Sequence, residues 1–126
     1  MPGKKILVVD DSPTVRQQVE DALSGSGFEL VEAADGAEGL SKLEGDSEIG
    51  LVILDVNMPR MNGLEMLDAM KQGGRNAGVH VVMLTSEGQQ SLIERAKKAG
   101  ARGWIVKPFK SEFLLGAVKK LLAVRG

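Results

Sequence analysis

Short runs of large apolar residues alternate along the chain with stretches in which apolar positions recur every three or four residues. The clearest run, Leu51 to Leu54, is followed at once by Asp55 and then by turn-forming residues. A short and uninterrupted apolar run is typical of a strand that is buried on both faces. We therefore predict a central strand over 51–54 that ends at Asp55.

The same pattern predicts four further strands and five helices. The other strands are expected at 4–9, 28–33, 79–84 and 102–106. The helices are expected at 13–25 or 13–27, 36–45, 63–72, 89–99 and 112–124. Because crossovers between parallel strands are nearly always right-handed, this alternation predicts an α/β fold, with one parallel sheet covered by helices on both faces. The length suits a single domain, residues 1–126.

Several helix starts carry capping residues. Ser12 precedes Pro13 at the start of the first helix. Asp35 and Asn62 each lie three positions before a Glu, which is the spacing of a capping box. Ser111 precedes the last predicted helix. The inward faces of the first two helices are expected to be formed by Val15, Val19, Ala22, Leu23, Ala37, Leu40 and Leu43.

Polar residues follow four of the five predicted strands. The first strand ends at Asp10 and Asp11, and later strands end at Asp55, Thr85 and Lys107. Parallel strands share one direction, so these residues are expected at one edge of the sheet, where open α/β sheets bind ligands. Each residue alone could be a helix-start acid, a cap or a solvated charge. Together they predict a Mg²⁺ site that holds a phosphoryl group on or beside Asp55.

Composition narrows the function classes. The chain has no Cys, which excludes disulfides and thiolate chemistry, and no apolar stretch near the ~20 residues that span a bilayer. We expect a cytoplasmic protein without a membrane partner. The formal net charge of −1 argues against nucleic acid as a direct partner. Residues 87–126 nevertheless carry nine Lys or Arg against three Glu.

These motifs together resemble the receiver domains of response regulators, and among them the stand-alone, CheY-like chemotaxis type. The resemblance covers essentially the whole chain and includes the residues that follow each site position: Asn57-Met58-Pro59, Asn62-Gly63, Ser86 and Pro108-Phe109. It implies a flavodoxin-like fold with strand order 2-1-3-4-5. It also implies a monomer that accepts a phosphoryl group from a histidine kinase in a two-component phosphorelay.

The resemblance assigns roles to the site residues. Asp55 would be the phosphoacceptor, and Lys107, with a cis bond to Pro108, would contact a phosphoryl oxygen. The Mg²⁺ cofactor would be held by Asp11, Asp55 and the main-chain carbonyl of Asn57, with Asp10 acting mainly through a metal-bound water. Thr85 would move toward the phosphoryl group, beside the small Ser86. The chain would catalyse only its own phosphorylation and dephosphorylation and is therefore not an enzyme in the usual sense.

Signal output in this family uses an aromatic residue on the fifth strand, which reshapes the face formed by helix four, strand five and helix five. Here that residue is Trp104, where Tyr or Phe is normal. A downstream protein effector would bind this face, with basic residues that suit an acidic partner: Arg95, Lys97, Lys98, Lys119 and Lys120. Asn57 and Glu87 match the pairing of receivers that lose their phosphate quickly, so a short-lived phosphoform is expected.

Four alternatives remain open from the sequence. The chain could be a relay intermediate or phosphate sink, or a receiver that acts as a scaffold without phosphorylation. An aspartate-nucleophile phosphatase of the haloacid dehalogenase type is less favoured, because its nucleophile comes first in an Asp-x-Asp motif, whereas Asp10 and Asp11 precede Asp55 here. A nucleotide or flavin binder is less favoured still, because acids instead of a Gly-rich loop follow the first strand.

Overall fold

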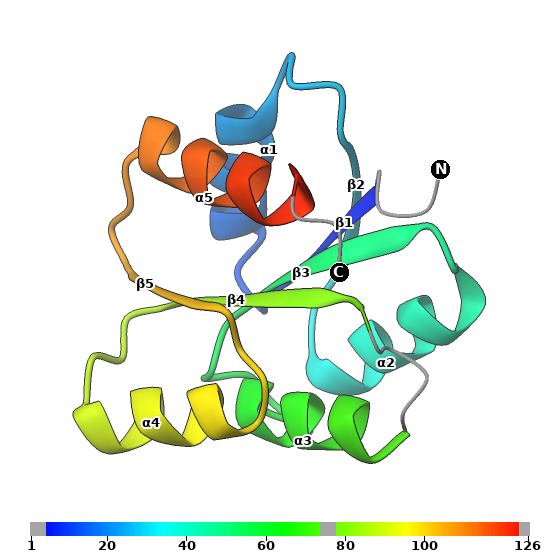
Figure 1. The fold of residues 1–126 in the computed structure, drawn as a ribbon, viewed down its shortest axis with the longest axis vertical. Coiled ribbons are helices and arrows are strands. Elements are labelled where there is room, and N and C mark those ends of the chain that lie inside the picture. The colour runs from blue at the N-terminus through cyan, green and yellow to red at the C-terminus, as the bar shows by residue number, and fades with distance from the viewer. Residues whose placement is uncertain (1–4, 74–77, 124–126) are drawn as a thin grey trace.

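Five strands and five helices alternate in the computed structural model, which describes residues 5–73 and 78–123. The strands are β1 (Lys5–Val9), β2 (Glu29–Ala33), β3 (Ile49–Leu54), β4 (His80–Thr85) and β5 (Gly103–Val106). The helices are α1 (Pro13–Leu23), α2 (Gly36–Gly45), α3 (Gly63–Gly73), α4 (Gln90–Lys98) and α5 (Ser111–Ala123), as Figure 1 shows. The α/β alternation predicted from the apolar runs is confirmed.

All five strands form one parallel sheet in the order β2-β1-β3-β4-β5, as the resemblance implied. Val9 of β1 lies opposite Leu54 of β3, and Leu54 lies opposite Met83 of β4. The carboxyl ends of the three central strands are therefore nearly level. Side chains that directly follow these strands meet at one edge of the sheet.

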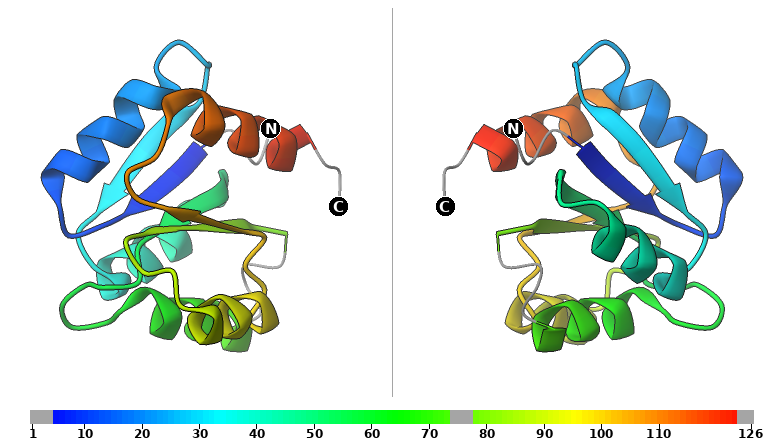
Figure 2. Two further views of the ribbon diagram at one scale, coloured as in Figure 1. Left: turned by 90° about the vertical axis from the view of Figure 1, so that its left-hand side faces the viewer. Right: turned by 90° about the vertical axis from the view of Figure 1, so that its right-hand side faces the viewer.

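The helices cover the sheet in two layers. Figures 1 and 2 show α1 and α5 on one face and α2, α3 and α4 on the other. Successive strand residues point to opposite faces, so Leu51 and Ile53 of β3 join the α1/α5 core, while Val52 and Leu54 join the core on the opposite face. This double coverage explains why β3 is buried along its whole length.

Three predicted caps form as expected, and one of them is the hydrogen bond that Asp35 Oδ1 accepts from Glu38 N at 2.9 Å at the start of α2. Ser12 Oγ accepts a hydrogen bond from Val15 N at 3.2 Å. Asn62 Oδ1 accepts from Glu65 N at 2.9 Å, and Glu65 Oε1 accepts from Asn62 N at 3.0 Å, which is a reciprocal capping box. The caps at Ser12 and Asn62 fix the start of α1 and α3 directly after the two loops that carry the site acids.

The predicted inward face of α2 is confirmed for Leu40 and Leu43, which pack in the core, and is wrong for Ala37. Ala37 is exposed, and the buried positions on this helix are Gly36, Gly39 and Leu43. A Cβ on Gly39 would lie 2.9 Å from Met66 Cε, so α2 approaches α3 too closely for a larger side chain. Gly36 and Gly39 thus form part of the buried face, a role that a pattern of apolar side chains does not mark.

Some element boundaries also differ. Strand β3 begins at Ile49 instead of Leu51, because Ile49 already pairs with Lys5 beside an irregularity in the register. Ser111 is the first residue of α5 and not the residue before it, and α1 ends at Leu23. The predicted element ends at residues 4 and 124 lie outside the described residues. Within 5–73 and 78–123, none of the helices has the length and apolar character that a bilayer span requires.

Candidate functional site

Three carboxylates meet at the carboxyl edge of the sheet. Asp10 and Asp11 follow β1, Asp55 follows β3, and each offers an oxygen within 4.8 Å of the others. Asp10 and Asp55 are 2% and 6% exposed, whereas Asp11 is open to solvent. The predicted acid cluster is thus formed, with two buried members and one that faces the surroundings.

Asp55 is held by the backbone on both sides of it. Its N–H donates to Val9 O at 3.0 Å, and its Oδ1 accepts from the N–H of Val56 at 2.8 Å. Gly63 packs against this turn, since a Cβ at that position would lie 2.0 Å from the main-chain oxygen of Asp55. Only a residue without a side chain fits there, so Gly63 fixes the depth at which the Asp55 turn sits.

Lys107 joins the cluster from the loop after β5. Its Nζ donates to Asp10 Oδ2 at 2.8 Å and lies 3.6 Å from Asp55 Oδ2. Its main-chain N–H donates to Thr85 O at 2.9 Å, and the Lys107–Pro108 peptide bond is cis, as the resemblance implied. The ammonium group thus lies between the two buried carboxylates.

The electrostatics of Asp55 favour binding of a cation. Burial raises the pKa of the Asp55 carboxyl above its ordinary value, and the charge of Asp10 raises it further. A hydrogen bond with the Thr85 side chain, the Lys107 charge and the Val56 N–H all lower this pKa, but they do not outweigh the burial. A hard divalent ion with oxygen ligands would relieve the repulsion between the acids, and the exposed Asp11 gives it access from solvent.

Asp10 is engaged at both carboxylate oxygens. Oδ1 accepts from Ser12 N at 2.9 Å and Oδ2 accepts from Lys107. Arg16 also donates to the main-chain carbonyl of Asp10 and pairs with Glu32 at 2.8 Å. The sequence interpretation missed this role of Arg16. The sequence indicates this role of Arg16 only through its position, one helical turn after the cap at Ser12.

The other predicted site residues lie around Glu87. Asn57 Nδ2 donates to Glu87 Oε2 at 2.7 Å, and the N–H of Glu87 donates to Thr85 Oγ1 at 3.3 Å. Trp104 is partly buried, and its Nε1 donates to the main-chain oxygen of Glu87 at 2.9 Å. Ser86 is exposed. The structure therefore connects the predicted switch and dephosphorylation residues through one side chain and its peptide groups.

A second link missed by the sequence interpretation fixes the loop after Asp55. Arg60 has a left-handed backbone, with φ of 65°, and its guanidinium pairs with the buried Asp35 carboxylate. Asp35 also caps α2 through Glu38 N at 2.9 Å, and Met61 O accepts from Gly36 N at 3.1 Å. These bonds tie the β3–α3 loop to the start of α2. The sequence offers no signal for the Arg60 contact.

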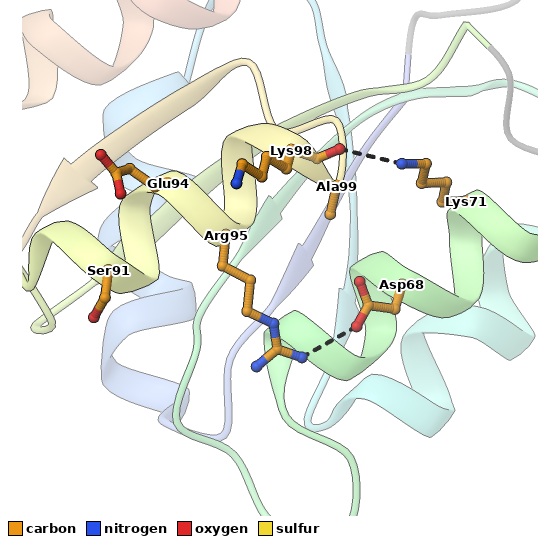
Figure 3. Close-up of a pocket in the computed structure, with 7 residues that line it drawn as sticks. All are labelled: Asp68, Lys71, Ser91, Glu94, Arg95, Lys98 and Ala99. Carbon is orange, nitrogen blue, oxygen red and sulfur yellow. Dashed lines mark hydrogen bonds and ion pairs between the residues drawn. The ribbon is translucent and has the colours of Figure 1, made fainter.

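The predicted basic surface is partly neutralised. Figure 3 shows a groove of about 440 Å³ between α3 and α4, in which Arg95 pairs with Asp68 at 3.1 Å and Lys71 Nζ donates to Lys98 O at 3.2 Å. Lys97, together with Lys119 and Lys120 of α5, is exposed.

Comparison with known proteins agrees with this geometry. The sequence profile of the response regulator receiver domain matches residues 6–119. The chain belongs to this family. It is 40% identical to the chemotaxis protein CheY of Bacillus subtilis over 119 residues, which are 94% of this chain and 97% of that protein.

Solved receiver structures superpose closely on this chain. The chemotaxis protein CheY4 of Vibrio cholerae gives a TM-score of 0.86 at 37% identity, covering 96% of this chain and 99% of that one. The CheX-CheY-BeF3-Mg complex of Borrelia burgdorferi gives a TM-score of 0.87 at 30% identity. The match covers 96% of this chain and 90% of that one. The chain is therefore a receiver of the CheY-like kind, and its relatives support a role in chemotaxis-type two-component signalling.

Proposed function

We propose that Asp55 accepts a phosphoryl group from the phosphohistidine of a histidine kinase and that the modified chain binds a protein effector of chemotaxis or motility. One observation carries this proposal. Three carboxylates lie within 4.8 Å of one another, and the Lys107 ammonium lies 3.6 Å from Asp55. A carboxylate that can act as a nucleophile, two acids that can help to hold a metal ion and a positive charge therefore lie together.

The transfer requires an in-line approach to Asp55. A carboxylate oxygen of Asp55 attacks phosphorus, a P–O bond forms, and the P–N bond to the donor imidazole breaks with its electron pair kept by nitrogen. The product is an acyl phosphate. Lys107 Nζ is placed to attract a phosphoryl oxygen, and the Thr85 hydroxyl is placed to donate a hydrogen bond to it. Attack by water on phosphorus later releases inorganic phosphate and restores the carboxylate, so the chain acts only on itself.

The donor set fits Mg²⁺. Asp11, Asp55 and the main-chain carbonyl of Asn57 would hold the ion directly, and the ion would neutralise charge on the phosphoryl oxygens. Both oxygens of Asp10 already accept hydrogen bonds, from Ser12 N and Lys107 Nζ, which suits a role through a metal-bound water. The CheX-CheY-BeF3-Mg complex of Borrelia burgdorferi, to which this chain is similar, supports this assignment.

The effector would bind the face formed by α4, β5 and α5. A pocket of about 120 Å³ lies beside Trp104 between α4 and β5, lined by Ile93 and Ala96 and flanked by Lys97 and Arg102. Val106 of β5 and Phe113 of α5 are 46% and 64% exposed. A pocket of this size takes one apolar side chain, and the cations beside it suit acidic neighbours on the partner. We therefore propose a short amphipathic, acidic segment as the binding element of the effector.

The proposal is tested by intact mass after incubation with acetyl phosphate and Mg²⁺. We expect one phosphate adduct on the wild type, no adduct on Asp55→Asn, and none when EDTA removes the metal. Trp104 fluorescence should change on phosphorylation and on addition of beryllofluoride. An unmodified wild type that also ignores beryllofluoride would refute the phosphoswitch and favour a scaffold role.

A relay or phosphate-sink role is distinguished by the fate of the phosphate. The Asn57–Glu87 hydrogen bond of 2.7 Å favours rapid loss as inorganic phosphate, which suits a transient signal or a sink. Transfer of the phosphoryl group to a histidine of a second protein, at a higher rate than the release of inorganic phosphate, would instead establish a relay intermediate.

A further inference from the structure

Glu87 connects the phosphorylation site to the surface face around Trp104. Its N–H donates to Thr85 Oγ1 at 3.3 Å, and the Thr85 side chain is close enough to Asp55 to lower the pKa of that carboxyl. Its carbonyl accepts from Trp104 Nε1 at 2.9 Å, and its carboxylate accepts from Asn57 Nδ2 at 2.7 Å. One residue thus contacts the phosphoacceptor site, the loop that follows Asp55 and the aromatic residue of β5.

The bond from Trp104 depends on an indole. The indole N–H is a donor only, and it projects from the side of the ring system. Phe has no donor, and the hydroxyl of Tyr extends from the far end of its ring. Trp104 itself is fixed by the sheet, where it lies opposite Met83, and its ring packs against the core on the α2/α3/α4 face. A rigid strand residue therefore holds the peptide group of a loop residue.

We propose that Trp104 is a positioning residue for loss of the phosphoryl group. By holding the Glu87 peptide, it keeps the Glu87 carboxylate against the Asn57 amide, two residues after the phosphoacceptor. The inference rests on the proposed function and extends it: the residue at the switch position sets the phosphoform lifetime through Glu87. An effector side chain that enters the pocket beside Trp104 and displaces the indole would then lengthen the life of the signal to which it is bound.

The test measures phosphate loss from protein that has been phosphorylated with acetyl phosphate and freed of donor. Trp104→Phe is expected to slow phosphate loss by roughly threefold to tenfold, the range expected for one ordinary hydrogen bond. Glu87→Ala is expected to slow it at least as much. Because Trp104 acts through Glu87, the double variant should match Glu87→Ala alone.

Two controls separate positioning from general destabilisation. Leu40→Ala removes a partly buried side chain that packs on the same core as Trp104 but lies on α2, and it should lower stability without changing phosphate loss. Replacement of Trp104 by benzothienylalanine keeps the ring shape and removes only the N–H, so it should reproduce the effect of Trp104→Phe. An unchanged rate in either Trp104 variant, or effects of Trp104→Phe and Glu87→Ala that multiply, would overturn the inference.

The hydrogen bond can be examined without any phosphate. The chain has one Trp, so an ¹⁵N-labelled sample gives one indole N–H resonance. Its exchange with solvent should be at least about tenfold slower than in urea-unfolded chain, as expected for a partly buried, bonded donor. Exchange at the unfolded rate would refute the geometry. Absence of any adduct on wild type refutes the proposed function together with this inference, whereas an adduct whose loss ignores Trp104 refutes the inference alone.

Discussion

Replacing Asp55 by Asn is expected to stabilise the metal-free protein while it abolishes phosphorylation. The Asp55 carboxylate is 6% exposed and lies within 4.8 Å of two other carboxylates. Burial raises its pKa, which means that the ionised form is disfavoured in the folded state. Asn has nearly the same shape and carries no charge, so the variant removes this electrostatic cost.

The size of the expected stabilisation follows from the distances between the charged groups. With an effective dielectric constant of about 20, the repulsion between Asp55 and Asp10 at up to 4.8 Å is at least about 3.5 kcal/mol, and the attraction to Lys107 at 3.6 Å is about 4.6 kcal/mol. These two terms largely cancel. The burial of the charge remains, and the hydrogen bonds from Val56 and Thr85 offset part of it. We expect a net gain of roughly 1–3 kcal/mol in the free energy of unfolding.

Urea unfolding in EDTA at pH 7 measures this gain, with Asp11→Asn as the control. Asp11 is exposed, so its substitution should have a smaller effect. Because the folded pKa of Asp55 lies above the ordinary value of 3.8, its destabilising effect is absent below that pH and grows as pH rises through the folded pKa. The advantage of Asp55→Asn should therefore shrink as pH is lowered from 7 toward 4.

Mg²⁺ should reverse the order by stabilising the wild type more than the variant, because it binds the folded acid cluster. A variant that is less stable than the wild type in EDTA at pH 7 would refute this reasoning.

Four further substitutions test other parts of the molecule. Asp35→Ala should lower the free energy of unfolding by roughly 1–2 kcal/mol, because Asp35 caps α2. That capping bond, first among its causes, holds the pKa of Asp35 low, so urea titrations should show its contribution lost as pH falls below 3.8. Gly63→Ala should lower the free energy of unfolding by about 3 kcal/mol or more, because its Cβ would collide with the main-chain oxygen of Asp55. Gly116→Ala has open space around it and should stabilise α5 by about 0.5–1 kcal/mol. Thermal unfolding measures both effects. Glu87→Lys should slow release of inorganic phosphate, and an unchanged rate would exclude a role of Glu87 in it.

The strands and the acid cluster were predictable because both depend on local sequence. An apolar run such as Leu51 to Leu54 is typical of a strand that is covered by helices on both faces. A residue that directly follows a strand of a parallel sheet lies at the carboxyl edge of that sheet. This rule assigns Asp10, Asp55 and Lys107 to one edge of the sheet. The contact of Lys107 with both acids confirms their convergence.

The missed features depend on contacts that the sequence does not encode locally. Ala37 was expected to face inward, but Gly36 and Gly39, which carry no side chain, take buried positions on α2. The bond from Trp104 ends on a main-chain carbonyl, which every residue possesses, so no side-chain pattern marks it. The Arg60 contact likewise depends on a left-handed turn at a residue that seldom adopts one.

The two outer strands of the sheet bear on how the protein behaves when it is concentrated. At one border, β5 has only four residues, and at the other, β2 exposes Glu29 and Glu32. A second molecule that aligned against β2 would have to accommodate the ion pairs that Glu29 and Glu32 make with Lys5 and Arg16, and one that aligned against β5 would gain few backbone hydrogen bonds. Both borders therefore disfavour strand addition. This property resists aggregation in a molecule whose sheet would otherwise offer two open templates.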